Sequence, residues 1–157
     1  MTAPNFELLK DAYAIIDGIP DDNLALNRWR TKDQGSSCGT IACAAGWLTL
    51  HPKFQELGLG VKRTECDQSM GPWPSFAGQT RIDALAVLFR LEFEDAYGLF
   101  GERWNTPARD LGLREQATDK EIFLARVLKF LSKHGQLKEQ LERRAHQQAV
   151  VQRALTP

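Results

Sequence analysis

The sequence predicts a mainly α-helical, compact domain of about five to seven helices with one long irregular loop. Apolar residues recur three and four positions apart through most of the chain, which is the spacing of a helix with one buried face. Glycine and proline concentrate in one stretch, residues 56–79, and interrupt that spacing. With 157 residues, 43% of them hydrophobic, the chain is large enough to bury one core without disulfides.

The first helix is expected to begin at Asn5 or Thr2, either of which can cap it, and to end at Gly18 and Pro20. A short second helical piece should follow Pro20. The apolar stripe of the first helix consists of Phe6, Leu9, Tyr13 and Ile16, and the second piece carries Leu24, Leu26 and Trp29.

The segment from Thr40 to Leu50 is apolar nearly all round, which predicts a central helix buried on every side. Its small residues would let another backbone approach closely, and Trp47 would fill the centre of the domain. His51-Pro52 is expected to end this helix, because a residue before proline disfavours the helical conformation.

Residues 56–79 form the long irregular loop, with weak alternation that allows a short β-hairpin near residues 60–76. Trp73 and Phe76 lie on its proline-stiffened part. Two aromatic side chains on such a loop can form a recognition surface, since tryptophan is enriched at binding hot spots. They can equally be a lid folded over the core.

Residues 83–100 have the length and apolar spacing of a helix-turn-helix, with the turn near Arg90-Leu91. The alternative is a plain helical hairpin in the core. The second helix has three acidic residues near its start, where a DNA reader would meet phosphates of like charge. This helix is marked by Phe93, Ala96, Tyr97 and Phe100, and its acidic residues are Glu92, Glu94 and Asp95.

A capping box formed by Thr118 and Glu121 opens a further helix that closes at His134-Gly135. We therefore divide the chain into a helical core domain, residues 1–135, and a C-terminal amphipathic helix, residues 136–157. The narrow apolar stripe of this tail, which includes Leu137 and Leu141, leaves it either docked on the core or free to bind a partner.

The charges and cysteines restrict the possible partners and compartment. Twenty Lys and Arg balance 20 Asp and Glu, so nucleic acid is not the favoured partner. We expect no signal peptide and no membrane-spanning segment. Three cysteines without a disulfide spacing are typical of a reducing compartment, so the expected location is the cytoplasm.

Cys38 is the sharpest candidate for catalysis. If the buried helix begins beside it, unpaired N–H groups and the helix dipole would stabilise a thiolate, a device that cysteine hydrolases use. Gln34, four residues upstream, resembles their oxyanion-hole glutamine, but its spacing does not match theirs and the usual aromatic residue after the nucleophile is missing. However, His51 would lie at the far end of the same helix, too distant to act as the base. A structural cysteine is the alternative to a cysteine-dependent hydrolase or transferase.

A zinc site would need Cys38, Cys43, Cys66 and His51 as ligands. Structural zinc sites usually pair ligands two to four residues apart, whereas Cys38 and Cys43 are five apart. We therefore expect neither a metal nor a cofactor, and a buried free cysteine at position 43.

Trp29-Arg30 followed by Cys38-Gly39-Thr40-Ile41-Ala42-Cys43-Ala44-Ala45-Gly46-Trp47 resembles a motif of small uncharacterised bacterial and phage proteins. In that family a tryptophan precedes Cys-Gly-Thr-x-x-Cys-x-Ala-Gly-(Trp or His). The stretch from Ala84 to Phe100 is similar to the family's second recurring piece. The resemblance implies a shared helical core and an origin on a phage, prophage or mobile element, and it carries no activity.

The function that the sequence favours is therefore a non-enzymatic factor that binds a host or partner protein, such as a phage factor that interferes with host defence or a toxin-neutralising partner. A cysteine hydrolase and a DNA-binding regulator are the alternatives. The oligomeric state is left open. The expected partner-binding residues are Trp73, Phe76, Leu137, Leu141 and Arg144.

Overall fold

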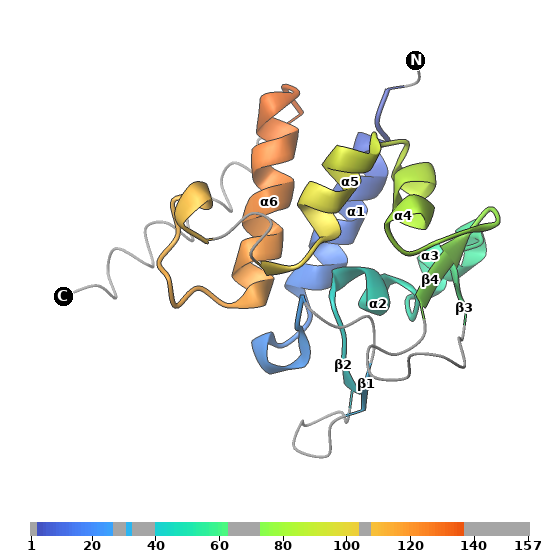
Figure 1. The fold of residues 1–157 in the computed structure, drawn as a ribbon, viewed down its shortest axis with the longest axis horizontal. Coiled ribbons are helices and arrows are strands. Elements are labelled where there is room, and N and C mark those ends of the chain that lie inside the picture. The colour runs from blue at the N-terminus through green and yellow to red at the C-terminus, as the bar shows by residue number, and fades with distance from the viewer. Residues whose placement is uncertain (1–2, 27–30, 33–39, 63–72, 104–107, 137–157) are drawn as a thin grey trace.

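The computed structural model describes residues 3–26, 31–32, 40–62, 73–103 and 108–136. Within them the chain is mainly α-helical, which confirms the predicted fold class (Figure 1). The α-helices are α1 (Phe6–Asp17), α2 (Ala44–Leu48), α3 (Pro52–Leu57), α4 (Arg81–Phe89), α5 (Phe93–Phe100) and α6 (Asp119–Lys133), and the 3₁₀ helices are η1 (Asp21–Asn23) and η3 (Ala108–Leu111).

Two small antiparallel sheets complete the described fold. Strand β1 (Thr31–Lys32) pairs with β2 (Thr40–Ile41), and β4 (Trp73–Phe76) lies between β3 (Gly60–Lys62) and β5 (Gln79–Thr80). The pairing of Gly60 with Ser75 and of Lys62 with Trp73 confirms the hairpin predicted near residues 60–76. Ala77 and Gly78, both at positive φ, make the two-residue turn into β5.

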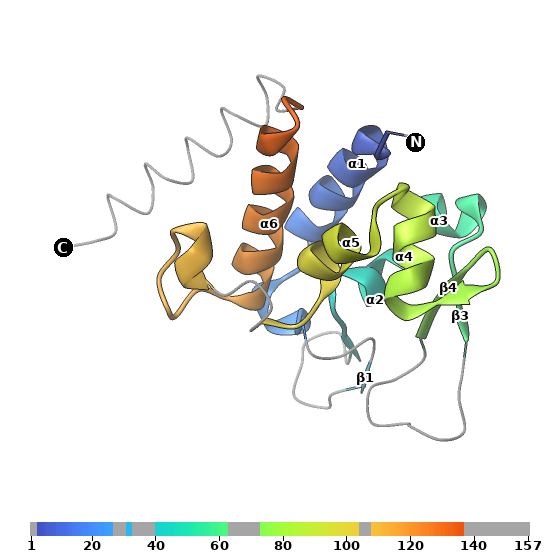
Figure 2. The same ribbon diagram turned by 45° about the horizontal axis from the view of Figure 1, so that its top comes forward.

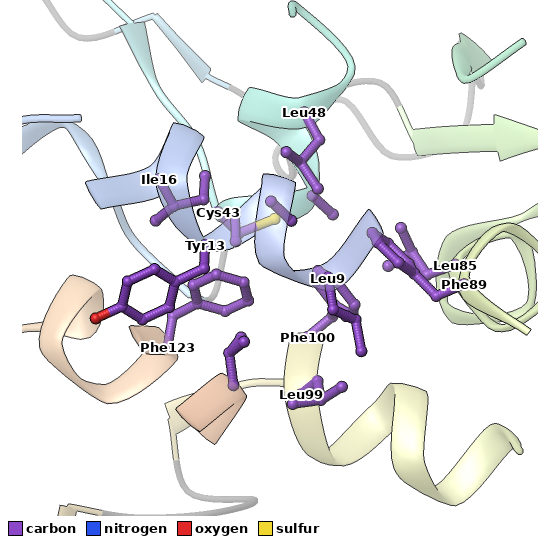
Figure 3. Close-up of a cluster of buried hydrophobic side chains, with 14 of the residues drawn as sticks. Leu9, Tyr13, Ile16, Cys43, Leu48, Leu85, Phe89, Leu99, Phe100 and Phe123 are labelled. Atoms are coloured by element: carbon purple, nitrogen blue, oxygen red, sulfur yellow. The ribbon is translucent and has the colours of Figure 1, made fainter. Parts of the chain in front are cut away.

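Helices α1, α5 and α6 pack together around the core, and α5 lies between α6 and α4 in both views (Figures 1 and 2). The centre of the domain is aromatic and aliphatic, with Tyr13 of α1 beside Phe123 of α6 and Phe100 of α5 (Figure 3). Full burial of each of these large side chains contributes about 1.5–3 kcal/mol. The fold is therefore held by helices distant in sequence that share one core.

The predicted ends of α1 and α6 are confirmed by their caps. The Asn5 side chain accepts a hydrogen bond from the backbone N–H of Leu8 at 3.1 Å, so Asn5 rather than Thr2 caps α1. Thr118 and Glu121 form both bonds of the capping box that opens α6. These local signals hold because they depend only on neighbouring residues.

The helix predicted from Thr40 to Leu50 is wrong in extent. Ala42 is extended, since its N–H donates to the carbonyl of Asn23 at 3.2 Å and its carbonyl accepts from Ala25 at 3.0 Å. Only Ala44–Leu48 is helical. An apolar run that is buried on every side has no period that distinguishes strand from helix, and here the chain uses both.

Two neighbouring expectations also change. The helical piece predicted after Pro20 is limited to η1, because Leu24 is extended and bridges Ala42. Pro52 does not follow the end of a long helix but opens α3 at its first turn, where proline's missing N–H costs nothing. Helix α3 was not predicted.

Candidate functional site

Helix α5 presents two stacked aromatic side chains to solvent. Phe93 and Tyr97 are one helical turn apart, with ring centroids 6.1 Å apart and planes inclined by 5°. They are 49% and 37% exposed. The apolar spacing of the sequence does not distinguish them from Ala96 and Phe100, yet the structure buries only the latter two.

The buried face of α5 borders this pair. Phe100 stacks with Phe89 of α4 at 5.3 Å and lies 5.6 Å from Phe123 of α6 (Figure 3). Ala96 and Leu99 complete the buried face. Because residues seven apart share a side of a helix, Phe93 lies at the border of this face, and both rings are partly buried as well as partly exposed.

Three carboxylates lie at the start of α5. Glu92 occupies the N-cap position without a side-chain capping hydrogen bond, Glu94 and Asp95 lie in the first turn, and α5 has no basic residue. Negative charge at a helix start interacts favourably with the helix dipole and so stabilises α5. Asp95 lies on the opposite side of the helix from the two rings, because residues two apart do not face each other, and we call Phe93, Glu94 and Tyr97 together the α5 surface.

The end of α5 is fixed by a buried arginine that sequence reasoning missed. Arg126 of α6 is 3% exposed, and its guanidinium donates to the carbonyls of Gly101 at 2.7 Å and Glu102 at 2.8 Å. Burial lowers its pKa to about 10, against a smaller opposing effect of Asp119. A cation at a helix C-terminus satisfies carbonyls that have no intrahelical donor, so Arg126 positions α5 on α6.

The two aromatic residues predicted to bind a partner, Trp73 and Phe76, are each half-buried on β4. The guanidinium of Arg81 lies 4.2 Å from the centroid of the Trp73 ring, a cation–π contact. Phe76 packs against the core and lies beside Gly58. One face of the Trp73 ring is thus covered by Arg81, and Phe76 contributes to the core as well as to the surface.

The helix start proposed for Cys38 belongs to Cys43. Cys38 lies outside the described residues, but α2 begins at Ala44, and Thr40 and Ile41 before it are in a strand. The premise that a helix begins directly after Cys38 is therefore wrong. The same correction removes the expected separation of Cys38 from His51 along one helix.

Cys43 has the position of a helix cap but not the chemistry of a nucleophile. Its Sγ accepts a hydrogen bond from the backbone N–H of Gly46 at 3.4 Å. The side chain is 2% exposed, and burial raises the pKa of its thiol from 9.0 to about 11, outweighing the backbone hydrogen bonds that lower it. The group is a thiol at neutral pH and belongs to no disulfide, which agrees with the buried structural cysteine expected at this position.

Of the other residues considered for a metal site, the structure describes His51 but not Cys66. His51 caps α3, and its Nδ1 accepts from the backbone N–H of Lys53 at 3.2 Å. Cys66 lies outside the described part of the chain. Within that part, no three His, Cys, Asp or Glu side chains are grouped so that they could hold a metal ion.

The predicted helix-turn-helix hairpin corresponds to α4, a left-handed residue at Arg90, and α5. The carboxylates of Glu94 and Asp95 occupy the first turn of the second helix, the part that meets DNA in this motif. The charge objection raised from the sequence therefore applies to the folded hairpin too.

Three predicted binding residues, Leu137, Leu141 and Arg144, lie outside the described residues. Across the part that the structure describes, no helix is long and apolar enough to cross a membrane. No protein-family model, curated protein or solved structure matches the chain.

Proposed function

We propose that this protein is a non-enzymatic interaction factor that binds a partner protein through the α5 surface. The observation that carries the proposal is the stacked, solvent-exposed pair of Phe93 and Tyr97. Aromatic side chains with few rotatable bonds supply large contact area at low entropic cost, and tyrosine is enriched at binding hot spots.

The support beneath the pair favours the same interpretation. Phe100 is held in the aromatic core, and Arg126 holds the carbonyls that follow α5. A surface on such a rigid element is already ordered before it binds, so association loses less conformational freedom. The exposed Glu94, next to Phe93, would contribute to the polar rim that interfaces commonly have.

The remaining parts of the proposal come from the sequence. Trp73 and Phe76, together with Leu137, Leu141 and Arg144 of the tail, would extend the contact area. The Cys-Gly-Thr motif resembles that of phage and bacterial proteins, so the proposed setting is the cytoplasm of a bacterium that carries a phage or mobile element. The proposed action there is to bind and modulate a host protein, for example one of host defence.

Affinity capture from the cells that naturally carry the protein tests this proposal. The bait is the tagged full chain, compared with a Phe93→Ser/Tyr97→Ser variant. Leu57→Ser is the matched control, because Leu57 is also an exposed apolar residue, 49% accessible, and lies on α3. We expect one host protein to be retained by the wild type and the control and lost from the double variant.

A partner retained equally by all three baits would show that α5 is not the binding surface. Monodisperse bait with no retained protein would contradict the interaction function itself. Circular dichroism melts of the three baits check that the substitutions, which are at exposed positions, leave the fold unchanged.

A further inference from the structure

We propose that Lys62, Trp73 and Arg81 form a second binding surface, which takes an acidic segment of a partner protein. We call these three residues the sheet surface. The inference goes beyond the proposed function, because it concerns a part of the fold other than α5 and states the charge of what binds there. It rests on the register of the sheet, the contact of Arg81 with Trp73, and the backbone conformation of Arg81.

The register of the sheet places Lys62 and Trp73 side by side. The two residues are Cα partners on the antiparallel strands β3 and β4, so their side chains lie on the same face of the sheet. Pro74 and Phe76 lie on the other face, because side chains alternate along a strand; Pro74 is buried and Phe76 packs against the core. Lys62, which is exposed, and Trp73, which is half-buried, therefore lie on the face opposite these core contacts. The sheet lies beside α4, on the side of the molecule away from α6 (Figures 1 and 2).

Arg81 of α4 adds a second cation to this face. Its guanidinium carbon lies over the Trp73 ring, 4.2 Å from the ring centroid. A guanidinium on an aromatic ring uses its flat face and leaves the N–H groups at its edge able to bind a carboxylate. Within the part of the chain that the structure describes, neither Arg81 nor Lys62 forms an ion pair. Both charges are therefore available to a partner.

The backbone of Arg81 adopts a conformation that is unfavourable for an arginine. Arg81 is the first residue of α4, and its φ of +55° lies in the left-handed region that residues other than glycine rarely adopt. Strained residues of this kind cluster at binding sites, where the conformation pre-positions a side chain. Here the guanidinium already lies on the indole ring before a partner arrives, which reduces the conformational freedom that binding would remove.

The charges of the sheet surface decide what binds there. Two cations and no anion among its three residues favour a ligand that carries carboxylates. Asp83, the next acidic residue along α4, is two positions from Arg81 and does not face it. A nucleic acid is not favoured, because it would meet only two cations and the chain as a whole has no net charge. Strand β3 lies at the edge of the sheet, so an extended acidic segment can lie along it and reach Lys62.

Fluorescence anisotropy of a fluorescein-labelled octaglutamate peptide, titrated at low salt with the full chain, tests the inference. We expect Arg81→Gln to weaken binding about tenfold, because it removes charge-assisted hydrogen bonds. Lys62→Gln should weaken it about threefold, since an exposed ion pair contributes less. Arg109→Gln is the matched control, because it removes the same charge from an arginine of η3 whose side chain is 86% exposed, and its affinity should equal that of the wild type.

Arg81→Gly separates binding from folding. Glycine adopts a positive φ without strain, so the midpoint of urea denaturation should not fall, whereas the affinity should fall as in Arg81→Gln. Retained affinity in either Arg81 variant would overturn the inference, and so would an equal loss in Arg109→Gln.

Two outcomes with the wild type would also overturn it. One is that octaglutamate does not bind, or binds no better than octaglutamine. The other is that a single-stranded DNA oligonucleotide of the same charge binds more tightly and loses affinity in the same variants, which would make the sheet surface a nucleic-acid site. No host protein is present in this experiment, so its failure leaves the capture result for the α5 surface untouched, and failure of the capture experiment leaves this one untouched.

Discussion

Replacement of Arg126 by alanine should be among the most destabilising single changes in the helical core. The side chain is almost fully buried, and its two strong hydrogen bonds go to the carbonyls of Gly101 and Glu102 at 2.7 and 2.8 Å. Weaker contacts at 3.4 Å reach the carbonyls of Leu99 and Arg103. The substitution thus removes the donors that close the end of α5.

The magnitude follows from three opposing contributions. Two carbonyls that lose their donors cost about 1–3 kcal/mol each, roughly 4 kcal/mol together. Relief from burying a cation, whose pKa burial lowers to about 10, returns about 3 kcal/mol. Loss of the packed aliphatic stem adds about 2–3 kcal/mol in Arg126→Ala but not in Arg126→Met. We therefore expect losses of about 3–4 kcal/mol for alanine and about 1 kcal/mol for methionine.

Urea denaturation followed by far-UV circular dichroism measures both variants. The midpoint should fall strongly for Arg126→Ala and slightly for Arg126→Met, with unchanged slopes. An alanine variant within about 0.5 kcal/mol of the wild type would refute the reasoning, because surface substitutions have effects of that size. A methionine variant as unstable as the alanine one would show that the hydrogen bonds, not the stem, dominate.

Three further predictions follow from the described geometry. Cys43 should resist iodoacetamide at pH 8 in the folded protein, as peptide mapping would show. The unfolded thiol ionises near 9.0 and the folded one near 11, so stability should fall between pH 9.0 and 11 more steeply than in Cys43→Ala, by up to roughly 3 kcal/mol. Gly58→Ala should lower the free energy of unfolding by about 1–2 kcal/mol in urea titrations, since φ at Gly58 is +105°. Gly98→Ala should instead raise it by about 0.5–1 kcal/mol, because Gly98 is in a helix and an added Cβ would meet nothing within 4 Å. Thr118→Ala should cost about 1 kcal/mol of thermal stability through the lost cap of α6, and an unchanged melting temperature would contradict that role.

The helices that the sequence predicts well are those whose ends are marked by side chains. Asn5 at α1 and Thr118 with Glu121 at α6 form local hydrogen bonds, so the residues that specify the ends are neighbours in sequence. The turn from β4 into β5, which the sequence analysis did not predict, is local in the same sense, since Gly78 has the positive φ that glycine favours. These features require no knowledge of the rest of the fold.

Features that depend on distant residues were not predictable in this way. The extended backbone of Ala42 is set by its pairing with Asn23 and Ala25, about twenty residues earlier. The burial of Arg126 depends on carbonyls at Gly101 and Glu102. Arginine as a residue type does not indicate burial. The available signal was the position of Arg126 between Ile122 and Phe130 on the apolar face of α6.

The exposure of Phe93 and Tyr97 is explained by the same competition among core residues. Helix α5 has apolar residues on more faces than the core can cover, so the positions held by Phe89, Phe123 and Arg126 decide which are buried. Ala96 and Phe100 are fixed inward by those contacts. Position 93 is seven residues before position 100 and shares a side of the helix with it, so Phe93 and Tyr97 border the buried face and remain 49% and 37% exposed. Core packing therefore accounts for the buried part of each ring, and the exposed part is the area through which we propose that a partner binds.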